Sequence, residues 1–117
     1  MSRILIVDDN LQNLYLIRFL LEQCDHDIDE AHNGEEAIAT LKTKVYDLIL
    51  MDVQMPVLDG LEATRRIKAE YNTPIVALTA KSMTGDREAI LQAGCDGYIQ
   101  KPIDPALFAG QVELFLT

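Results

Sequence analysis

The sequence is poor in cysteine, in positive charge and in long apolar runs, and each shortage argues against a class of protein. Cys24 and Cys95 lie far apart, without Cys-x-x-Cys spacing or a nearby histidine in a ligand pattern, so we expect two buried or partly buried thiols. Ten basic residues against nineteen acidic ones give a net charge of -9, the wrong sign for binding nucleic acid directly. Residues 4–7 are too short for a signal-peptide core, and no run approaches membrane-spanning length. We therefore expect a cytoplasmic protein.

The composition is that of an ordinary globular chain. Apolar residues make up 49% and charged residues 25% of the 117 positions. This length suits one domain that buries most of its surface around a single core. Because we find no internal repeat, low-complexity tract or linker, we expect a single domain over residues 1–117 without a separate output module.

Short apolar runs alternate with amphipathic stretches, and the connections between them are short. This alternation predicts an α/β fold with five parallel strands wrapped by helices on both faces. The expected strands are residues 4–7, 26–31, 47–51, 74–78 and 97–100. The expected helices are residues 11–23, 34–41, 60–70, 82–93 and a last helix from 105.

Helix starts carry recognisable capping residues. Asn10 and Asp104 are expected to cap the first and last helices, the latter with proline at its first position. Asn33 and Asp59 are each followed three residues later by glutamate, as in a capping box. We expect Gly60 to take backbone angles closed to other residues.

Two predicted elements are weak. The second strand is acidic, and Ile28 is its only large apolar residue, so we place it at a sheet edge. The helix over residues 82–93 has Gly85 in its first turn and an apolar face of little more than two alanines and Ile90. We expect this helix to end at Gly94 and to be among the less stable elements.

Polar residues stand where four of the predicted strands end. Parallel strands joined by right-handed crossovers point the same way, so Asp8, Asp9, Asp52, Thr79 and Lys101 fall at one edge of the sheet. In a doubly wound sheet of order 2-1-3-4-5, ligands bind in the crevice between strands 1 and 3. Those two strands carry the three aspartates.

Three crowded carboxylates repel one another, and a hard divalent cation removes that cost. With oxygen ligands and no histidine or cysteine cluster, Mg²⁺ or Mn²⁺ is favoured. Thr79 adds a hydroxyl and Lys101 a positive charge, so a phosphoryl group could be held there. Taken singly, each residue has a structural explanation, and Asp52 could be a simple turn former. Their common location is what indicates a site.

These motifs resemble the response-regulator receiver domains of bacterial two-component signalling over essentially the whole chain. The similar segments are residues 4–10, 47–56 with the Asp-Gly pair at 59–60, 77–80 and 94–102. The resemblance implies a flavodoxin-like fold and a signalling domain rather than an enzyme, one that catalyses only its own phosphotransfer and slow autodephosphorylation. Asp52 would accept the phosphoryl group from a phosphohistidine of a histidine kinase or a histidine phosphotransfer domain.

The resemblance also implies roles for the surrounding residues. Asp9, Asp52 and the main-chain carbonyl of Gln54 would hold Mg²⁺, with Asp8 acting mainly through a coordinated water. Lys101 would contact the phosphoryl oxygens, and the bond from Lys101 to the following proline would be cis.

In such domains a threonine and an aromatic residue form a switch, here Thr79 and Tyr98. Phosphorylation would draw the Thr79 hydroxyl toward the phosphoryl group and let Tyr98 turn inward. The surface of the fourth helix, fifth strand and fifth helix would then change and could bind an effector protein. Gln54 and Lys81 occupy variable positions that tune the phosphoryl lifetime.

The residues of these motifs are similar to those in the receivers of hybrid kinases and phosphorelays. The main departure is Asp25, in a turn that often carries glycine. Relay to a histidine phosphotransfer domain and allosteric binding of a partner both remain open.

Two other functions use similar features. A haloacid-dehalogenase-type phosphohydrolase needs a second acid two residues after its nucleophile, where this chain has Gln54. A flavodoxin-like flavin-binding module needs a phosphate loop after strand 1, where Asp8 and Asp9 would repel phosphate.

Overall fold

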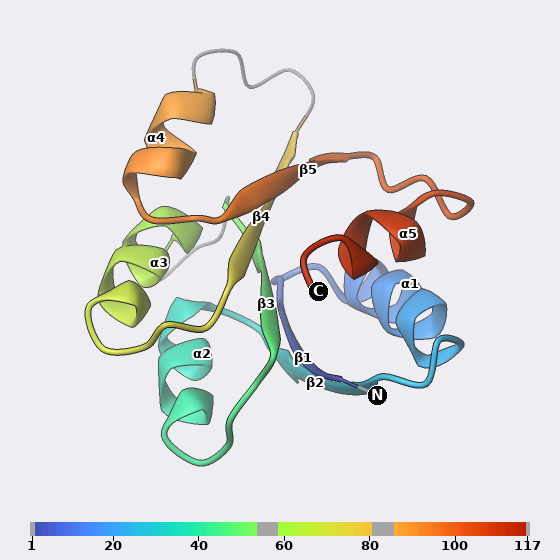
Figure 1. Cartoon of the computed structure of the whole chain (residues 1–117), viewed down its shortest axis with the longest axis horizontal. Helices are drawn as coiled ribbons and strands as arrows, with labels where there is room; N and C mark the ends of the chain where they lie inside the picture. The colour runs from blue at the N-terminus through green and yellow to red at the C-terminus, as the bar shows by residue number, and fades with distance from the viewer. Residues whose placement is uncertain (1, 54–58, 81–85, 117) are drawn as a thin grey trace.

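The computed structural model describes residues 2–53, 59–80 and 86–116 (Figure 1). Five parallel strands form one sheet in the order β2-β1-β3-β4-β5, which confirms the predicted fold class and strand order. The strands are β1 (Arg3–Val7), β2 (Asp27–Ala31), β3 (Leu48–Asp52), β4 (Ile75–Ala80) and β5 (Gly97–Lys101). The helices are α1 (Leu11–Glu22), α2 (Gly34–Leu41), α3 (Gly60–Lys68), α4 (Asp86–Gln92) and α5 (Phe108–Glu113).

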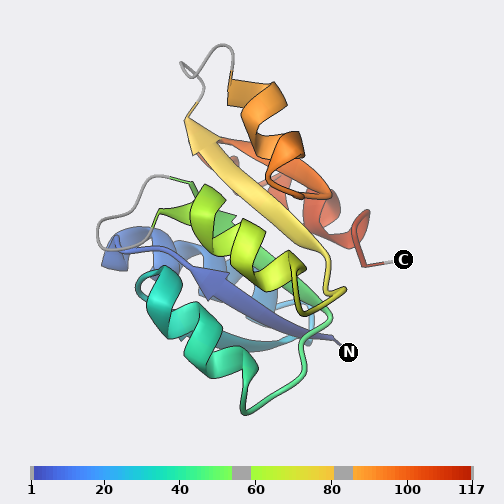
Figure 2. The same ribbon diagram turned by 90° about the vertical axis from the view of Figure 1, so that its left-hand side faces the viewer.

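Helices cover both faces of the sheet. α1 and α5 lie on one face, and α2, α3 and α4 lie on the other, which faces the viewer in Figure 2. Side chains alternate along the strands, so Ile4 and Ile6 pack toward α1 and α5 while Leu5 and Val7 pack toward the opposite helices. Every residue of the central strand β3 is buried. The end of β3 is therefore held from both sides.

Three helices begin where their caps predict. The side-chain oxygens of Asn10, Asn33 and Asp59 accept hydrogen bonds from backbone N–H groups three residues later, at 2.9 to 3.0 Å. In the capping box at Asn33, the Glu36 carboxylate was expected to accept from the N–H of Asn33. It accepts from the N–H of His32 instead.

The last helix begins later than predicted. A turn occupies residues 105–107, in which the Asp104 carboxylate accepts from Ala106 N and its carbonyl accepts from Phe108 N, both at 2.9 Å. α5 therefore starts at Phe108 rather than at Pro105. Phe108 and Val112 are buried in the core.

The turn after α1 exposes one of the two thiols. Cys24 is exposed at the end of α1, whereas Cys95 is buried, and burial raises the pKa of the Cys95 thiol. The prediction that both thiols are buried is therefore wrong for Cys24, because the chain leaves the core there to turn toward β2. Asp25 in that turn has a φ of 64°, the left-handed conformation that glycine adopts most easily.

The fourth helix is only partly described. Its predicted start, including Gly85, lies outside the described residues. The described part, Asp86–Gln92, buries Ile90, and Ala93 just after it is buried too. The chain then turns at Gly94, whose φ is 108°, as predicted. Among the described residues, no helix is long and apolar enough to cross a membrane.

The acidic strand β2 lies at a sheet edge, as predicted, and a buried tyrosine stabilises it. Tyr46, 3% exposed, donates a hydrogen bond of 2.6 Å from its hydroxyl to the Asp29 carboxylate. This bond is the main cause that holds the pKa of Asp29 below its ordinary value of 3.8, and the Lys44 ammonium acts in the same direction. Burial, followed by the bond to Asp29, raises the pKa of Tyr46.

Removing this hydroxyl is expected to weaken the fold in a pH-dependent way. Because the pKa of Asp29 is lowered in the folded state, the bond stabilises fully above pH 3.8 and less as the pH falls through the folded pKa. Tyr46→Phe should lower the free energy of unfolding by about 1 kcal/mol near neutral pH, and by less in acid. Urea unfolding of the parent and the Tyr46→Phe protein, near neutral pH and in acid, measures this difference in stability. Lys44→Ala, which removes only an exposed ion pair, should cost below about 0.5 kcal/mol.

Candidate functional site

The structure brings the acidic residues predicted from the strand ends together. Carboxylate oxygens of Asp8, Asp9 and Asp52 all lie within 4.8 Å of one another. Asp8 is fully buried and Asp52 is 4% exposed, whereas Asp9 is exposed. Asp52 is the last residue of β3 rather than the residue after it. The site is therefore a pair of buried carboxylates with a third at the surface.

The start of α1 orients Asp8. One carboxylate oxygen accepts a hydrogen bond from Asn10 N at 2.9 Å, and the other lies 3.4 Å from the Asn13 side-chain amide. The backbone N–H of Asp8 donates to the carbonyl of Ala31 at the end of β2. Asp8 is thus held by both the helix that follows it and the neighbouring strand.

A lysine at the end of β5 reaches across the strand ends to the acidic group. The Lys101 ammonium donates to Asp52 Oδ1 at 3.1 Å and lies 3.5 Å from Asp8 Oδ2. The Lys101 side chain is 24% exposed, so this ion pair is mostly removed from solvent. The peptide bond from Lys101 to Pro102 is cis, which confirms the expectation from the resemblance.

Gly60, at the start of α3, lies directly against the backbone of β3. A Cβ placed on Gly60 would lie 2.0 Å from the carbonyl oxygen of Asp52 and 2.8 Å from the Cα of Val53. The φ of Gly60 is not in the left-handed region, so the reason given from the sequence was wrong. Glycine is needed because backbone meets backbone.

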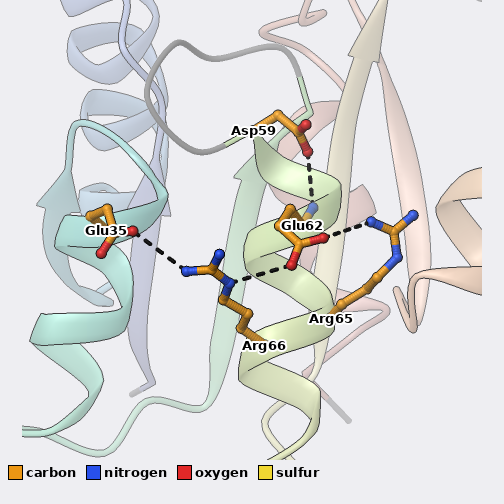
Figure 3. A network of polar contacts seen from close by, with 5 residues as sticks. All are labelled: Glu35, Asp59, Glu62, Arg65 and Arg66. Atoms are coloured by element: carbon orange, nitrogen blue, oxygen red, sulfur yellow. Dashed lines mark hydrogen bonds and ion pairs between the residues drawn. The ribbon is translucent and has the colours of Figure 1, made fainter.

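Side chains around Gly60 hold α3 in this close approach. Asp59 caps the helix through the N–H of Glu62, and the Glu62 carboxylate pairs with Arg65 and Arg66 on the following turn (Figure 3). Arg66 also reaches Glu35 on α2 at 3.5 Å. The start of α3 is therefore fixed by its cap and tied to the adjacent helix.

Of the remaining predicted residues, the structure describes Thr79 and Tyr98. Thr79 is buried within β4 and pairs in register with Gln100. Tyr98 is half-buried in β5, and its hydroxyl accepts hydrogen bonds from Arg87 on α4. Gln54 and Lys81 lie outside the described residues, so their predicted roles stay predictions.

Two features of the structure were not predicted from the sequence. The first is Arg87, whose contact with Tyr98 depends on α4 lying beside β5. The second is an exposed apolar stripe on α1, formed by Leu11, Tyr15 and Phe19. Their spacing of four residues could have indicated the stripe, because such residues share one face of a helix.

The donor set suits a hard divalent cation. Three carboxylates carry three negative charges, and Lys101 balances one of them. A divalent ion would balance the other two, and the oxygen donors match Mg²⁺ or Mn²⁺. Asp9 is exposed and Asp52 nearly buried, so an ion between them would face solvent on one side.

Comparison with known proteins gives a consistent match along the chain. The family model described as response regulator receiver domain matches residues 4–113. The polar-differentiation response regulator DivK of Brucella anthropi is 39% identical over 116 residues, covering 97% of this chain and 94% of DivK. The transcriptional regulatory protein ResD of Bacillus subtilis is 46% identical over 104 residues, covering 89% of this chain.

Several relatives are much longer than this chain. The chain spans 43% of ResD and 7% to 14% of four matched sensor proteins and histidine kinases. Among solved structures, the receiver domain of sensor histidine kinase PA1611 from Pseudomonas aeruginosa has a TM-score of 0.89 at 38% identity. The match covers 98% of this chain and 97% of that one, which holds a magnesium ion coordinated in its active site cleft.

The contact between Gly60 and Asp52 predicts that replacing glycine by alanine changes the stability in opposite directions at two positions, Gly60 and Gly110. Gly60→Ala should lower the free energy of unfolding by about 1–3 kcal/mol, because the added methyl group meets backbone that cannot yield easily. Gly110→Ala in α5 is the matched control. A Cβ there meets nothing within 4 Å, so alanine should raise the stability by about 0.5–1 kcal/mol. Urea unfolding of both variants is the measurement, and equal effects at the two positions would contradict the proposed contact.

Proposed function

Because the chain belongs to the response regulator receiver domain family, we propose that Asp52 is the residue that accepts a phosphoryl group in two-component signalling. One observation carries the proposal. A nearly buried carboxylate ends the central strand, an ammonium lies 3.1 Å away, and two more carboxylates adjoin it. This arrangement combines a nucleophile with charges suited to a metal ion and a phosphoryl group.

The proposed reaction is phosphotransfer from a phosphohistidine. A carboxylate oxygen of Asp52 attacks the phosphorus, the O–P bond forms as the P–N bond breaks, and the electron pair leaves with the imidazole nitrogen. Lys101, already placed beside Asp52 Oδ1, neutralises part of the charge on the phosphoryl oxygens. The product is an acyl phosphate on Asp52.

Asp9, Asp52 and the main-chain carbonyl of Gln54 are the proposed ligands of Mg²⁺ or Mn²⁺, with Asp8 acting through a coordinated water. The buried, hydrogen-bonded position of Asp8 supports that indirect role, because its oxygens already accept bonds from Asn10 and Asn13. When bound, the ion would supply positive charge that offsets the negative charge of the carboxylates and of the phosphoryl oxygens.

We assign residues 1–117 to one cytoplasmic receiver unit that catalyses only its own phosphotransfer and slow autodephosphorylation. Its partners are proposed to be a histidine kinase or a histidine phosphotransfer domain, and neither nucleic acid nor a membrane. The flavin-binding alternative gains no support from the described site, since Asp8 and Asp9 adjoin Asp52 where a phosphate would have to bind. The phosphohydrolase alternative is disfavoured because Gln54 stands where that mechanism needs a second acid.

The output is proposed to pass through Thr79 and Tyr98. Both lie on neighbouring strands, two residues apart in register, since Thr79 pairs with Gln100 and Ala77 with Tyr98. At Tyr98, a groove of about 890 Å³ opens between α4, β5 and α5, lined by residues that include Tyr98 and Leu107. An effector protein could bind there, and relay to a phosphotransfer domain remains the other output.

Phosphorylation by a small donor tests the assignment of Asp52. Incubation with acetyl phosphate and Mg²⁺ should add one phosphoryl group, detected by intact-protein mass spectrometry. Asp52→Asn or removal of divalent ions with EDTA should prevent the addition, since the nucleophile or its charge balance is lost. Unchanged labelling of the Asp52→Asn protein would refute the assignment. The Asp47→Asn protein, changed at an exposed carboxylate before β3, should be labelled normally.

The apolar stripe on α1 is a proposed contact for the phosphodonor protein. Leu11, Tyr15 and Phe19 are 70%, 74% and 51% exposed, and the stripe starts two residues after Asp9. Contiguous exposed apolar side chains commonly mark a protein interaction surface. A helical donor lying along α1 would therefore bring its phosphohistidine to the strand ends.

This docking predicts a difference between two donors. Tyr15→Asp should slow transfer from a phosphorylated histidine phosphotransfer domain about tenfold, because it places a charge in the contact, and should leave labelling by acetyl phosphate unchanged. Radiolabel transfer time courses with each donor measure this. Val45→Asp is the control. Val45 is 83% exposed and precedes β3, so it lies where the strand begins, away from the strand ends that carry the site. Equal slowing by both variants would show that α1 is not the docking surface.

A further inference from the structure

One arginine links helix α4 to the tyrosine on strand β5. Arg87 donates hydrogen bonds from Nε, at 2.7 Å, and from Nη2 to the hydroxyl oxygen of Tyr98. The guanidinium carbon also lies 5.2 Å from the centroid of the Tyr98 ring. The same side chain therefore contacts both the polar end and the face of the aromatic ring.

The link matters because α4 is otherwise held by few side chains. In the described part of α4, Ile90 is the buried residue, and Ala93 follows just beyond the helix. The strand pairing of Tyr98 with Ala77 fixes the backbone of β5. The pair Arg87–Tyr98 thus joins a lightly anchored helix to a firmly paired strand, beside the groove between α4, β5 and α5.

We propose that Arg87 is a positioning residue that holds Tyr98 in the half-buried orientation described here and so opposes the phosphorylated conformation. This inference rests on the proposed function for its consequence, since the proposed inward turn of Tyr98 accompanies phosphorylation of Asp52. To turn inward, Tyr98 must give up both hydrogen bonds from Arg87 and the contact between guanidinium and ring.

Thermodynamic linkage then connects Arg87 to the phosphorylation site. The Arg87 contacts lower the fraction of unphosphorylated molecules in which Tyr98 is turned inward, so a phosphorylation step that favours the inward orientation is disfavoured in proportion. Loss of the Arg87 contact should therefore make the domain easier to phosphorylate. The expected increase is about threefold, the ratio that one exposed cation–π contact supports.

The first test observes Tyr98 with no phosphodonor present. The protein is labelled with 3-fluorotyrosine, and the Tyr98 resonance is assigned by its absence from the Tyr98→Phe protein. Arg87→Ala should shift this ¹⁹F resonance, and Arg87→Lys, which keeps the charge but loses the paired donors, should shift it less. Glu88→Ala, a change at the adjacent exposed position, should leave it in place. An unchanged Tyr98 resonance in Arg87→Ala would refute the inference, whether or not Asp52 is phosphorylated.

The second test measures labelling by acetyl phosphate and Mg²⁺ as a double-mutant cycle. Arg87→Ala should be phosphorylated about threefold faster than the parent protein, and the change should vanish in a Tyr98→Leu background. An equal effect of Arg87→Ala in both backgrounds would show that Arg87 acts through α4 or net charge and not through Tyr98. Labelling that persists in Asp52→Asn would refute the proposed function alone, because the ¹⁹F shift does not depend on it.

Discussion

The backbone of Asp52 and the backbone of Gly60 touch with no side chain between them, and the site depends on that contact. It sets the distance between the end of the central strand and the start of α3, while the strand pairing sets where the Asp52 carboxylate stands relative to Asp8 and Lys101. Burial of every β3 residue prevents the strand from moving away. The polar site is thus placed by packing rather than by its own charges, which repel one another until a cation or Lys101 balances them.

Much of this arrangement follows from the sequence by simple rules. Periodic apolar runs predict the strands, and right-handed connection of parallel strands predicts that Asp8, Asp52, Thr79 and Lys101 lie at one edge of the sheet. The caps of α1, α2 and α3 were equally predictable, because one side-chain oxygen and one nearby N–H define each of them. Local chemistry and topology together were sufficient for these features.

The features that escaped prediction depend on contacts between distant residues. The sequence marks Gly60 as unusual but not why, since its neighbour Asp52 is brought close only by the fold. Asp104 and Pro105 favour a helix start locally, yet the chain forms a turn there before α5 begins at Phe108. Arg87 looks like any surface charge until α4 is placed beside Tyr98. In each case the missing information was the packing of one element against another.

The two thiols differ in accessibility, so their reactivities can be compared to probe local opening of the fold. Cys24 is exposed at the turn before β2, while Cys95 is buried between α4 and β5 and donates to Thr64, whose hydroxyl donates in turn to the carbonyl of Gly60. A thiol reagent reacts with the accessible thiolate form, so burial and a raised pKa both protect Cys95. The rate at which Cys95 is modified, compared with the rate for the exposed Cys24, would report how often the region joining α3, α4 and β5 opens.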